Sequence, residues 1–269
     1  MVVYPNCKIN LGLNIISKRP DGFHNIESVF YPVAWCDMLE IIPAASDSFI
    51  FDGLRLNCAT EENICYKAWN LVKKHFDIPG ISMYLYKKIP FGAGLGGGSS
   101  DGAYVLMALN ELFGLNIKRK FMAGLASELG SDCTFFLDNR PCFVSGTGGD
   151  IAPVELSLKR YYLVVVKPSV SVSTVEAYRM ITAQKPVLQL SEVITRPVAS
   201  WKKYLFNDFE SPVMAQYPAI QKVKDRLYEM GAVYAAMSGS GSAVYGLFLH
   251  EVEADNDFAG CQMWKGWLD

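Results

Sequence analysis

The chain has 269 residues, of which 51% are hydrophobic and 19% charged, a composition that suits a packed core and excludes a disordered chain. Its 25 Lys and Arg residues against 27 Asp and Glu residues give a net charge of −2, so no field of one sign attracts nucleic acid or an anionic membrane. We expect two domains, because single cores tend to split beyond about 250 residues.

The cysteines and the apolar runs argue against several further classes of protein. Seven cysteines without a Cys-x-x-Cys pair, and three scattered histidines, predict neither a disulfide framework nor a zinc site. Most thiols are expected to be buried apolar residues in a reducing compartment, with the cytoplasm as the default. The run Tyr161–Val166 is shorter than the ~20 residues of a spanning helix, so we expect no membrane span. The segment Met1–Lys8 has no charged region followed by an apolar run, so we expect no signal peptide.

Strands are predicted first along the chain. Strict alternation from Cys7 to Ile15 predicts a half-buried strand with Lys8 and Asn10 on its polar face. The segment Ser28–Ile42 predicts further strand. Two residues are expected to interrupt it, namely Pro32 and Asp37.

Helices and strands then alternate irregularly. Thr60 is the predicted cap of a helix with an apolar face from Ile64 to Phe76, and Ile81–Ile89 predicts a strand. A helix that ends at Gly114 is expected to be capped by Ser99, Ser100 or Asp101. The later predicted elements are a helix over Lys118–Leu129, a strand over Tyr161–Lys167, a helix over Pro218–Met230, and strands over Ala232–Met237 and Ala243–Leu249. This order predicts an α+β fold.

The densest feature is the segment Pro90–Gly102, which holds six of the 22 glycines between a predicted strand and a predicted helix. Backbone amides in such a loop converge on an anion, and the helix start adds positive potential. The segment therefore predicts a phosphate site, with a tight connector as the alternative. The segment is not a P-loop, because no lysine precedes Ser99 or Ser100. It also does not fit a dinucleotide-binding loop, which needs an acidic residue about 20 positions after the glycines, because Glu111 comes too early and Asp132 too late.

Five segments together resemble a known family. Pro90–Ser100 resembles the ATP loop of the GHMP kinase superfamily, and Ser238–Ser242 resembles the third motif of that superfamily. Cys7–Leu11, Arg19–His24 and Gly130–Cys133 resemble segments of its branch that acts on a cytidine diphosphate derivative of a methyl polyol. The chain departs from the pattern at three positions, Cys7, Phe23 and Ala93.

The resemblance implies a two-domain α+β GHMP kinase fold, with a ribosomal-S5-like domain over residues 1–155 and a ferredoxin-like domain over residues 156–269. It implies ATP-dependent phosphorylation of the 2-hydroxyl of that polyol derivative, in the non-mevalonate route to isoprenoids. ATP and Mg²⁺ are the implied cofactors, and no nucleic acid or membrane partner is expected. The alternatives are a GHMP kinase for homoserine, mevalonate or a sugar, a dinucleotide-binding oxidoreductase, and a nucleotide-binding protein without catalysis.

The same resemblance implies roles for individual residues. Asp132 is expected to act as the base, and Lys8 to stabilise the transferring phosphoryl group or orient the hydroxyl and Asp132. The implied nucleotide contacts are Asn63, Lys87, Pro90, Phe91, Gly92, Ala93, Gly94, Leu95, Gly96, Gly97, Gly98, Ser99 and Ser100. The implied substrate contacts are Asn10, Phe23, His24, Thr174 and Tyr178.

Within the substrate set, His24 is expected to read the cytosine edge, and Phe23 and Tyr178 to hold the base between their rings. Each polar residue also has a structural alternative. Asp132 would be a turn residue and Lys8 a solvated strand residue, while Asn63 and Lys87 would be polar ends of elements. The ligands of Mg²⁺ are left unassigned.

Overall fold

The computed structural model describes residues 1–55 and 58–268, and the chain divides into two compact units. The first unit comprises Met1–Cys7, Trp35–Phe91 and Gly96–Arg140, and the second comprises Lys8–Ala34, Gly92–Leu95 and Pro141–Asp269. The chain therefore passes from one unit to the other and back within the glycine-rich loop. The domain boundary at residues 155 and 156 stays a prediction.

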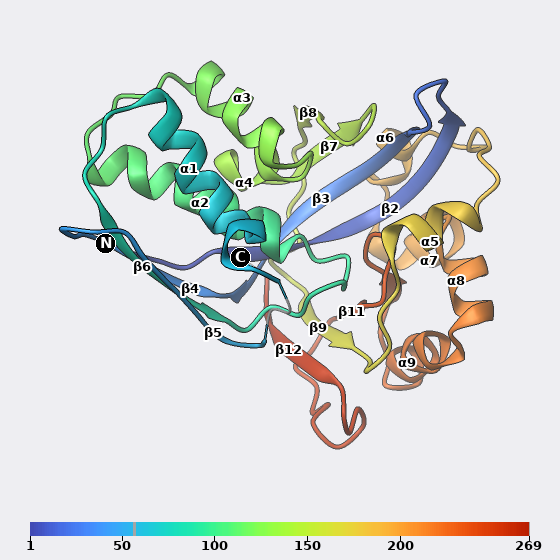
Figure 1. Ribbon diagram of the computed structural model, residues 1–269. Helices are drawn as coiled ribbons and strands as arrows, with labels where there is room; N and C mark the ends of the chain where they lie inside the picture. The colour runs from blue at the N-terminus through green and yellow to red at the C-terminus, as the bar shows by residue number, and fades with distance from the viewer. Residues whose placement is uncertain (56–57, 269) are drawn as a thin grey trace. The chain divides into compact units, whose positions relative to one another are not determined.

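The first unit is built on one four-stranded sheet. Its strands follow the order β1 (Val2–Val3), β4 (Met38–Pro43), β6 (Ile81–Lys87) and β5 (Ser48–Gly53). The pair β5–β6 is parallel, and β4 is antiparallel to both β1 and β6. One face of the sheet carries the helices α1 (Ile64–His75), α2 (Gly97–Leu112), α3 (Arg119–Leu129) and α4 (Cys133–Asp138) (Figure 1).

The core of the first unit lies between this sheet and these helices. Alternate residues of the strands and the apolar stripes of the helices fill it. Its side chains are at most 1% exposed at Leu39, Val72, Leu85, Leu106 and Leu109.

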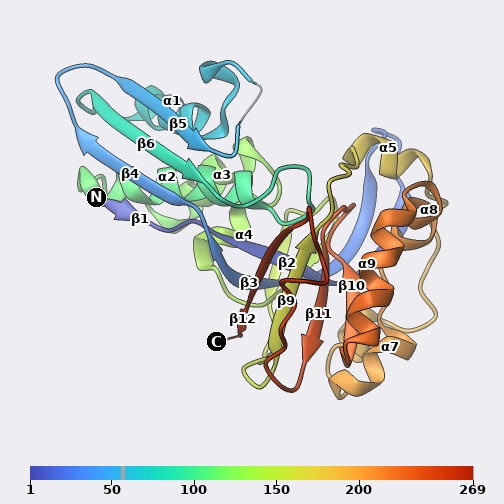
Figure 2. The same ribbon diagram turned by 90° about the horizontal axis from the view of Figure 1, so that it is seen from below.

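The second unit contains two sheets. One follows the order β2 (Asn6–Lys18), β3 (His24–Cys36), β7 (Cys142–Ser145) and β8 (Asp150–Pro153). The other is antiparallel throughout, in the order β10 (Tyr234–Met237), β11 (Val244–Phe248), β9 (Tyr162–Lys167) and β12 (Gln262–Trp267) (Figure 2).

Short helices accompany the second unit. They are α5 (Thr174–Arg179), α6 (Leu190–Val193), α7 (Trp201–Tyr204), α8 (Glu210–Gln216) and the longer α9 (Pro218–Glu229), with 3₁₀ turns at Val198–Ser200 and, in the first unit, at Thr60–Glu62. Helix α9 packs against β10 and β11. The resulting core includes the fully or almost fully buried Val164, Val166, Ile220, Leu227 and Phe248.

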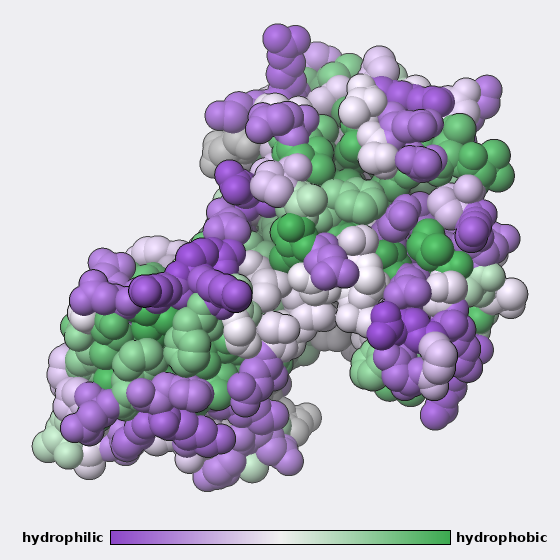
Figure 3. Space-filling view, turned by 90° about the horizontal axis from the view of Figure 1, so that it is seen from above, coloured by the Kyte–Doolittle hydropathy of each residue, from purple (hydrophilic) through white to green (hydrophobic). Residues whose placement is uncertain are grey.

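Exposed apolar side chains are scattered over several elements. Phe121 of α3 is 44% exposed, Val175 of α5 is 61% exposed and Trp267 of β12 is 48% exposed. Figure 3 shows such apolar areas, in green, between larger polar areas on the face seen from above. Isolated apolar residues are ordinary on a protein surface. In the part of the chain that the structure describes, no helix is long and apolar enough to cross a membrane.

Most predicted periodic elements are confirmed, and the differences have local causes. Strand β3 continues through Pro32. This proline lies beyond Ser28–Phe30, the residues of β3 that pair with β7, so its missing amide hydrogen removes no hydrogen bond between these two strands. Asn63 rather than Thr60 caps α1, because the 3₁₀ turn precedes the helix. The left-handed Gly96, not one of the predicted serines or Asp101, is the N-cap of α2.

Candidate active site

The glycine-rich loop owes its shape to glycines with positive φ. Gly92, Gly94 and Gly96 have φ of +57°, +73° and +69°. A Cβ on Gly94 would lie 1.9 Å from the carbonyl oxygen of Ser238, so only glycine permits this approach of two backbones. The loop therefore has a defined shape that depends on glycine at these positions.

Beyond the loop, the start of α2 offers backbone donors. The Ser100 amide makes an intrahelical bond, donating to the Gly96 carbonyl at 2.9 Å. The first amides of a helix have no intrahelical acceptor, and in α2 these belong to the residues before Ser100, namely Gly97, Gly98 and Ser99. Together with the positive end of the α2 dipole, these groups suit a bound anion.

A buried ion-pair cluster lies at the base of the loop in the first unit. The Lys87 ammonium contacts the carboxylates of Asp37 and Asp101, the latter at 2.7 Å, and the three side chains are at most 2% exposed. Asp37 also accepts hydrogen bonds from the Lys88 and Ile89 amides, at 2.5 and 2.8 Å. Because Asp101 lies on α2, the cluster ties the two ends of the loop together.

Burial and charge act in opposite directions in this cluster. Burial raises the pKa of Asp101 to about 8, against the lowering effect of the Lys87 charge. Burial alone would lower the pKa of Lys87, but the charges of Asp101 and Asp37 outweigh it and leave that pKa raised. We conclude that the lysine stays charged and that its charge favours the anion of Asp101, which burial disfavours.

A second polar cluster lies in the other unit, around Lys8 on β2. The Lys8 ammonium donates to the Asn10 side-chain oxygen at 2.6 Å and to the Gly94 carbonyl at 3.0 Å. The Ser238 hydroxyl donates to the same Gly94 carbonyl at 2.8 Å, and the Asn10 amide donates to that hydroxyl oxygen at 3.2 Å. Three of the predicted motifs therefore meet here.

This cluster excludes the structural alternative for Lys8. That alternative made Lys8 a solvated strand residue, but Lys8 and its neighbour Asn10 are only 3% and 1% exposed. Gly94 and Ser238 cover that face, and the Asn10 side-chain amide also donates to the Ser28 hydroxyl at 2.8 Å. A lysine is rarely buried at this level without a specific arrangement of acceptors.

Asp132 belongs to the first unit. It occupies the N-cap position of α4, where its carbonyl accepts from the Phe135 amide at 3.3 Å, and its side chain makes no capping hydrogen bond. Asp132 is partly exposed, whereas the adjacent Cys133 is buried. Burial raises the pKa of the Cys133 thiol to about 12, so that thiol stays protonated.

The predicted base-binding residues occupy one region of the second unit. The rings of His24 and Tyr178 stack, with centroids 4.8 Å apart and planes at 19°. Phe23 is 66% exposed, and the Thr174 hydroxyl lies 3.2 Å from that of Ser240. The structure thus pairs Tyr178 with His24, and the expected binding of a base between the rings of Phe23 and Tyr178 stays a prediction.

The remaining predicted contacts have structural roles that the structure shows directly. The Asn63 side chain accepts from the Cys65 amide at 2.8 Å and caps α1. The Leu95 carbonyl accepts from the Lys8 amide, and the Ala93 carbonyl accepts from the Ala243 amide. Sequence reasoning missed Asp37 and Asp101 as the partners of Lys87, because no local pattern links residues so far apart in the chain.

Two family models match this chain. The model described as the GHMP kinases N terminal domain matches residues 63–146, and the model described as GHMP kinases C terminal matches residues 190–261. The two matches together span more than half of the chain. The chain belongs to the GHMP kinase family. It is an ATP-dependent small-molecule kinase with the α+β fold of that family, and the predicted fold class and enzyme class are confirmed.

Two relatives of this GHMP kinase share the same protein name. It is 48% identical over 270 residues to a protein of Parabacteroides distasonis named 4-diphosphocytidyl-2-C-methyl-D-erythritol kinase, with 100% of both chains covered. A protein of the same name from Bacteroides thetaiotaomicron is 50% identical, with 92% of each chain covered.

Two solved structures share the fold of this chain. A structure titled as a 4-(cytidine 5'-diphospho)-2C-methyl-D-erythritol kinase is 32% identical, with a TM-score of 0.85 and coverage of 100% of this chain and 99% of the other. The mevalonate kinase of Methanococcus jannaschii, at 13% identity, a TM-score of 0.72 and coverage of 100% and 98%, shares the fold.

Proposed function

We propose that this GHMP kinase transfers the γ-phosphoryl group of ATP to the 2-hydroxyl of 4-diphosphocytidyl-2-C-methyl-D-erythritol, a step of the non-mevalonate route to isoprenoids. The observation that carries the proposal is the identity of 48% over the full length of a relative with that name. The cluster of Lys8, Asn10, Gly94 and Ser238 supports it, because it joins the motifs of the phosphate loop and of the substrate strand.

The proposed reaction balances as an in-line displacement. The oxygen of the 2-hydroxyl forms a bond to the γ-phosphorus, the bond from that phosphorus to the β,γ-bridging oxygen breaks, and ADP leaves. The hydroxyl proton passes to the Asp132 carboxylate, which acts as general base. Lys8 stabilises the charge on the transferring group or orients the hydroxyl and Asp132.

The loop Gly92–Ser100 is proposed to hold the phosphates of ATP. The first amides of α2 and the helix dipole supply positive potential in a chain whose net charge is only −2. Lys87, Phe91 and Asn63 are proposed to lie on the adenine side. In the described structure the Lys87 ammonium lies 5.4 Å from the Phe91 ring centroid.

Mg²⁺ fits this chain as a companion of ATP rather than as a resident ion. Among the residues that the structure describes, no three His, Cys, Asp or Glu side chains gather into a metal site. Mg²⁺ commonly binds through substrate phosphates and waters with few protein ligands. The partly exposed Ser99 hydroxyl is the group that would complete its shell. When bound, the ion neutralises charge that develops on the phosphate oxygens.

The cytidine end of the acceptor is proposed to bind at His24, Tyr178, Phe23 and Thr174. A stacked His24–Tyr178 pair beside an exposed Phe23 offers ring faces to a pyrimidine and ring nitrogens to its polar edge. A cytoplasmic location for the protein stays a prediction.

An acceptor comparison tests the proposal. Purified protein with ATP and Mg²⁺ is offered the cytidyl-methylerythritol substrate, mevalonate, homoserine and galactose in separate coupled assays of ADP release. We expect turnover with the cytidyl substrate and at most background with the other three. Preferential turnover of any other acceptor contradicts the proposed substrate, and ADP release on none of them contradicts the proposed acceptor class.

A further inference from the structure

We propose that Asn207 is a positioning residue of the active site, which acts by fixing the turn Ser238–Ser242 against the strand that carries Lys8 and Asn10. The inference rests on the proposed function, since Ser238 of that turn belongs to the cluster with Lys8, Asn10 and Gly94. No motif in the sequence singled out the segment Asn207–Glu210, which precedes and begins α8.

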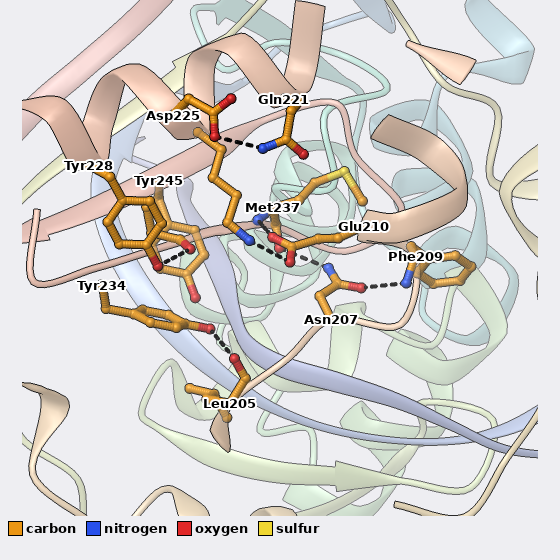
Figure 4. Close-up of polar contacts among 12 residues, drawn as sticks. Leu205, Asn207, Phe209, Glu210, Gln221, Asp225, Tyr228, Tyr234, Met237 and Tyr245 are labelled. Carbon is orange, nitrogen blue, oxygen red and sulfur yellow. Dashed lines mark hydrogen bonds and ion pairs between the residues drawn. The ribbon is translucent and has the colours of Figure 1, made fainter. Parts of the chain in front are cut away.

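The Asn207 side chain is held inside the second unit by three hydrogen bonds. Its amide nitrogen donates to the carbonyls of Met237 and Gly239, each at 2.8 Å, and its oxygen accepts from the Phe209 amide at 3.0 Å. Figure 4 shows this side chain between Met237 and Phe209. At 3% exposure, Asn207 has no access to solvent that would replace these partners.

The two acceptors of Asn207 lie on either side of Ser238. The donor groups of one amide therefore fix the backbone on both sides of the residue whose hydroxyl contacts the Gly94 carbonyl and the Asn10 side chain. A buried carbonyl that loses its donor is costly, so the turn would shift to find another. Such a shift would move Ser238 away from Gly94.

Glu210 supports the same turn from the neighbouring position. Its carboxylate accepts from the Met237 amide at 2.7 Å and pairs with Lys224 of α9 at 2.7 Å (Figure 4). Residue Met237 is thus bound through its carbonyl by Asn207 and through its amide by Glu210. The start of the turn is fixed at both of its backbone groups.

The segment is also attached to the strand of Lys8. The Leu13 amide donates to the Phe206 carbonyl at 2.9 Å, and the Asp208 amide donates to the Leu13 carbonyl at 2.9 Å. The Asp208 carboxylate accepts from the Ile15 amide at 2.7 Å. One segment therefore holds both β2 and the turn Ser238–Ser242, and it sets the position of Ser238 relative to Asn10.

The first test is Asn207→Ala, measured for kcat and for the KM of ATP. A small displacement of a positioning group costs about 10- to 100-fold in rate, so we expect kcat to fall by about that factor. Asn116→Ala is the matched control, because Asn116 is an exposed amide that donates only locally, to the Gly114 carbonyl, and we expect it to keep wild-type kcat. Equal kcat values for the two variants would overturn the proposal.

A double-mutant cycle separates positioning from a general loss of structure. If Asn207 acts through Ser238, then Ser238→Ala and Asn207→Ala combine to a loss in kcat/KM well below the product of the two single losses. Independent, multiplicative losses would contradict the proposal. All variants are assayed below the onset of thermal unfolding measured for each of them.

If Asn207→Ala does not fold, the pair Glu210→Gln and Glu210→Ala decides. The glutamine keeps an oxygen that accepts from the Met237 amide but loses the ion pair with Lys224, whereas the alanine loses both, so we expect the alanine to lower kcat more than the glutamine. Equal kcat for both refutes the positioning role. The wild-type assay on the acceptor panel runs alongside, so that failure of the proposed substrate is recognised separately.

Discussion

The buried cluster of Lys87, Asp37 and Asp101 gives the strongest stability prediction. Replacing the lysine in Lys87→Met keeps a long apolar stem of similar volume but removes the charge between two carboxyl groups. Because all three side chains are at most 2% exposed, solvent cannot take over the role of the ammonium. The variant is therefore expected to behave as a broken buried ion pair rather than as a lost surface contact.

The magnitude follows from that burial. Removing one partner of a buried pair costs about 3–5 kcal/mol, against about 0–1 kcal/mol for an exposed pair. With a urea m-value of about 2 kcal/mol per M, the unfolding midpoint falls by about 2 M. Circular dichroism and tryptophan fluorescence in a urea titration measure this shift.

The pH dependence of the loss has a defined sign. In Lys87→Met, the Lys87 charge no longer opposes burial, so the pKa of Asp101 rises further above its value in the unfolded chain. A carboxyl group with a raised pKa stabilises the fold fully below the unfolded pKa of about 4, and this contribution is lost as the pH rises. The deficit relative to wild type is thus expected to be larger at about pH 9, above the wild-type Asp101 pKa of about 8, than at about pH 5.

Lys265→Met is the matched control, because Lys265 also pairs with two carboxylates, those of Glu253 and Asp255, at 3.2 and 2.6 Å. Those carboxylates are 88% and 63% exposed, so the control is expected to shift the midpoint by no more than the error of the titration. Equal midpoints for the two lysine variants, or a deficit that grows toward low pH, would refute the reasoning.

Three further variants test the proposed site. Asp132→Asn is expected to lower kcat by at least about 100-fold while ATP still binds in calorimetry, because the amide cannot accept the hydroxyl proton; a kcat near wild type would remove Asp132 from the role of base. Gly94→Ala places a methyl group 1.9 Å from the Ser238 carbonyl oxygen at positive φ and is expected to abolish turnover and lower the melting temperature, whereas Gly124→Ala, with open space around its Cβ, is expected to do neither. Tyr178→Ala is expected to raise the KM of the cytidyl substrate about tenfold or more with an unchanged KM for ATP; an effect on ATP alone would place the tyrosine elsewhere.

Periodic patterns in the sequence predict the regular elements of this fold. The helix over Lys118–Leu129 and the strand over Tyr161–Lys167 lie within one residue of α3 and β9. Their signals are local, since each depends on the spacing of apolar residues along a single element. The one-turn helices α6 and α7 lack such a signal, because a helix of four residues shows no period and is stabilised by tertiary contacts.

Polar residues of the site were predicted only where a local motif marks them. The glycine-rich loop is visible because its composition is unusual over thirteen residues, Pro90–Gly102. The burial of Lys8 is not visible, because alternation along β2 says nothing of the segments that cover its polar face, here Gly94 and Ser238. Asn207 gives no signal either, since its acceptors are backbone carbonyls about thirty residues away, which any sequence would supply.

The position of the new phosphate in the product tests the central proposal most directly. The acceptor carbon bears a methyl group and no hydrogen, so a phosphomonoester on the 2-hydroxyl has no proton on the carbon that carries its oxygen. We predict that the proton-coupled ³¹P spectrum of the product shows the new monoester phosphorus as a singlet beside the two diphosphate signals. A monoester signal split by protons on the attached carbon would show transfer to another hydroxyl and contradict the account.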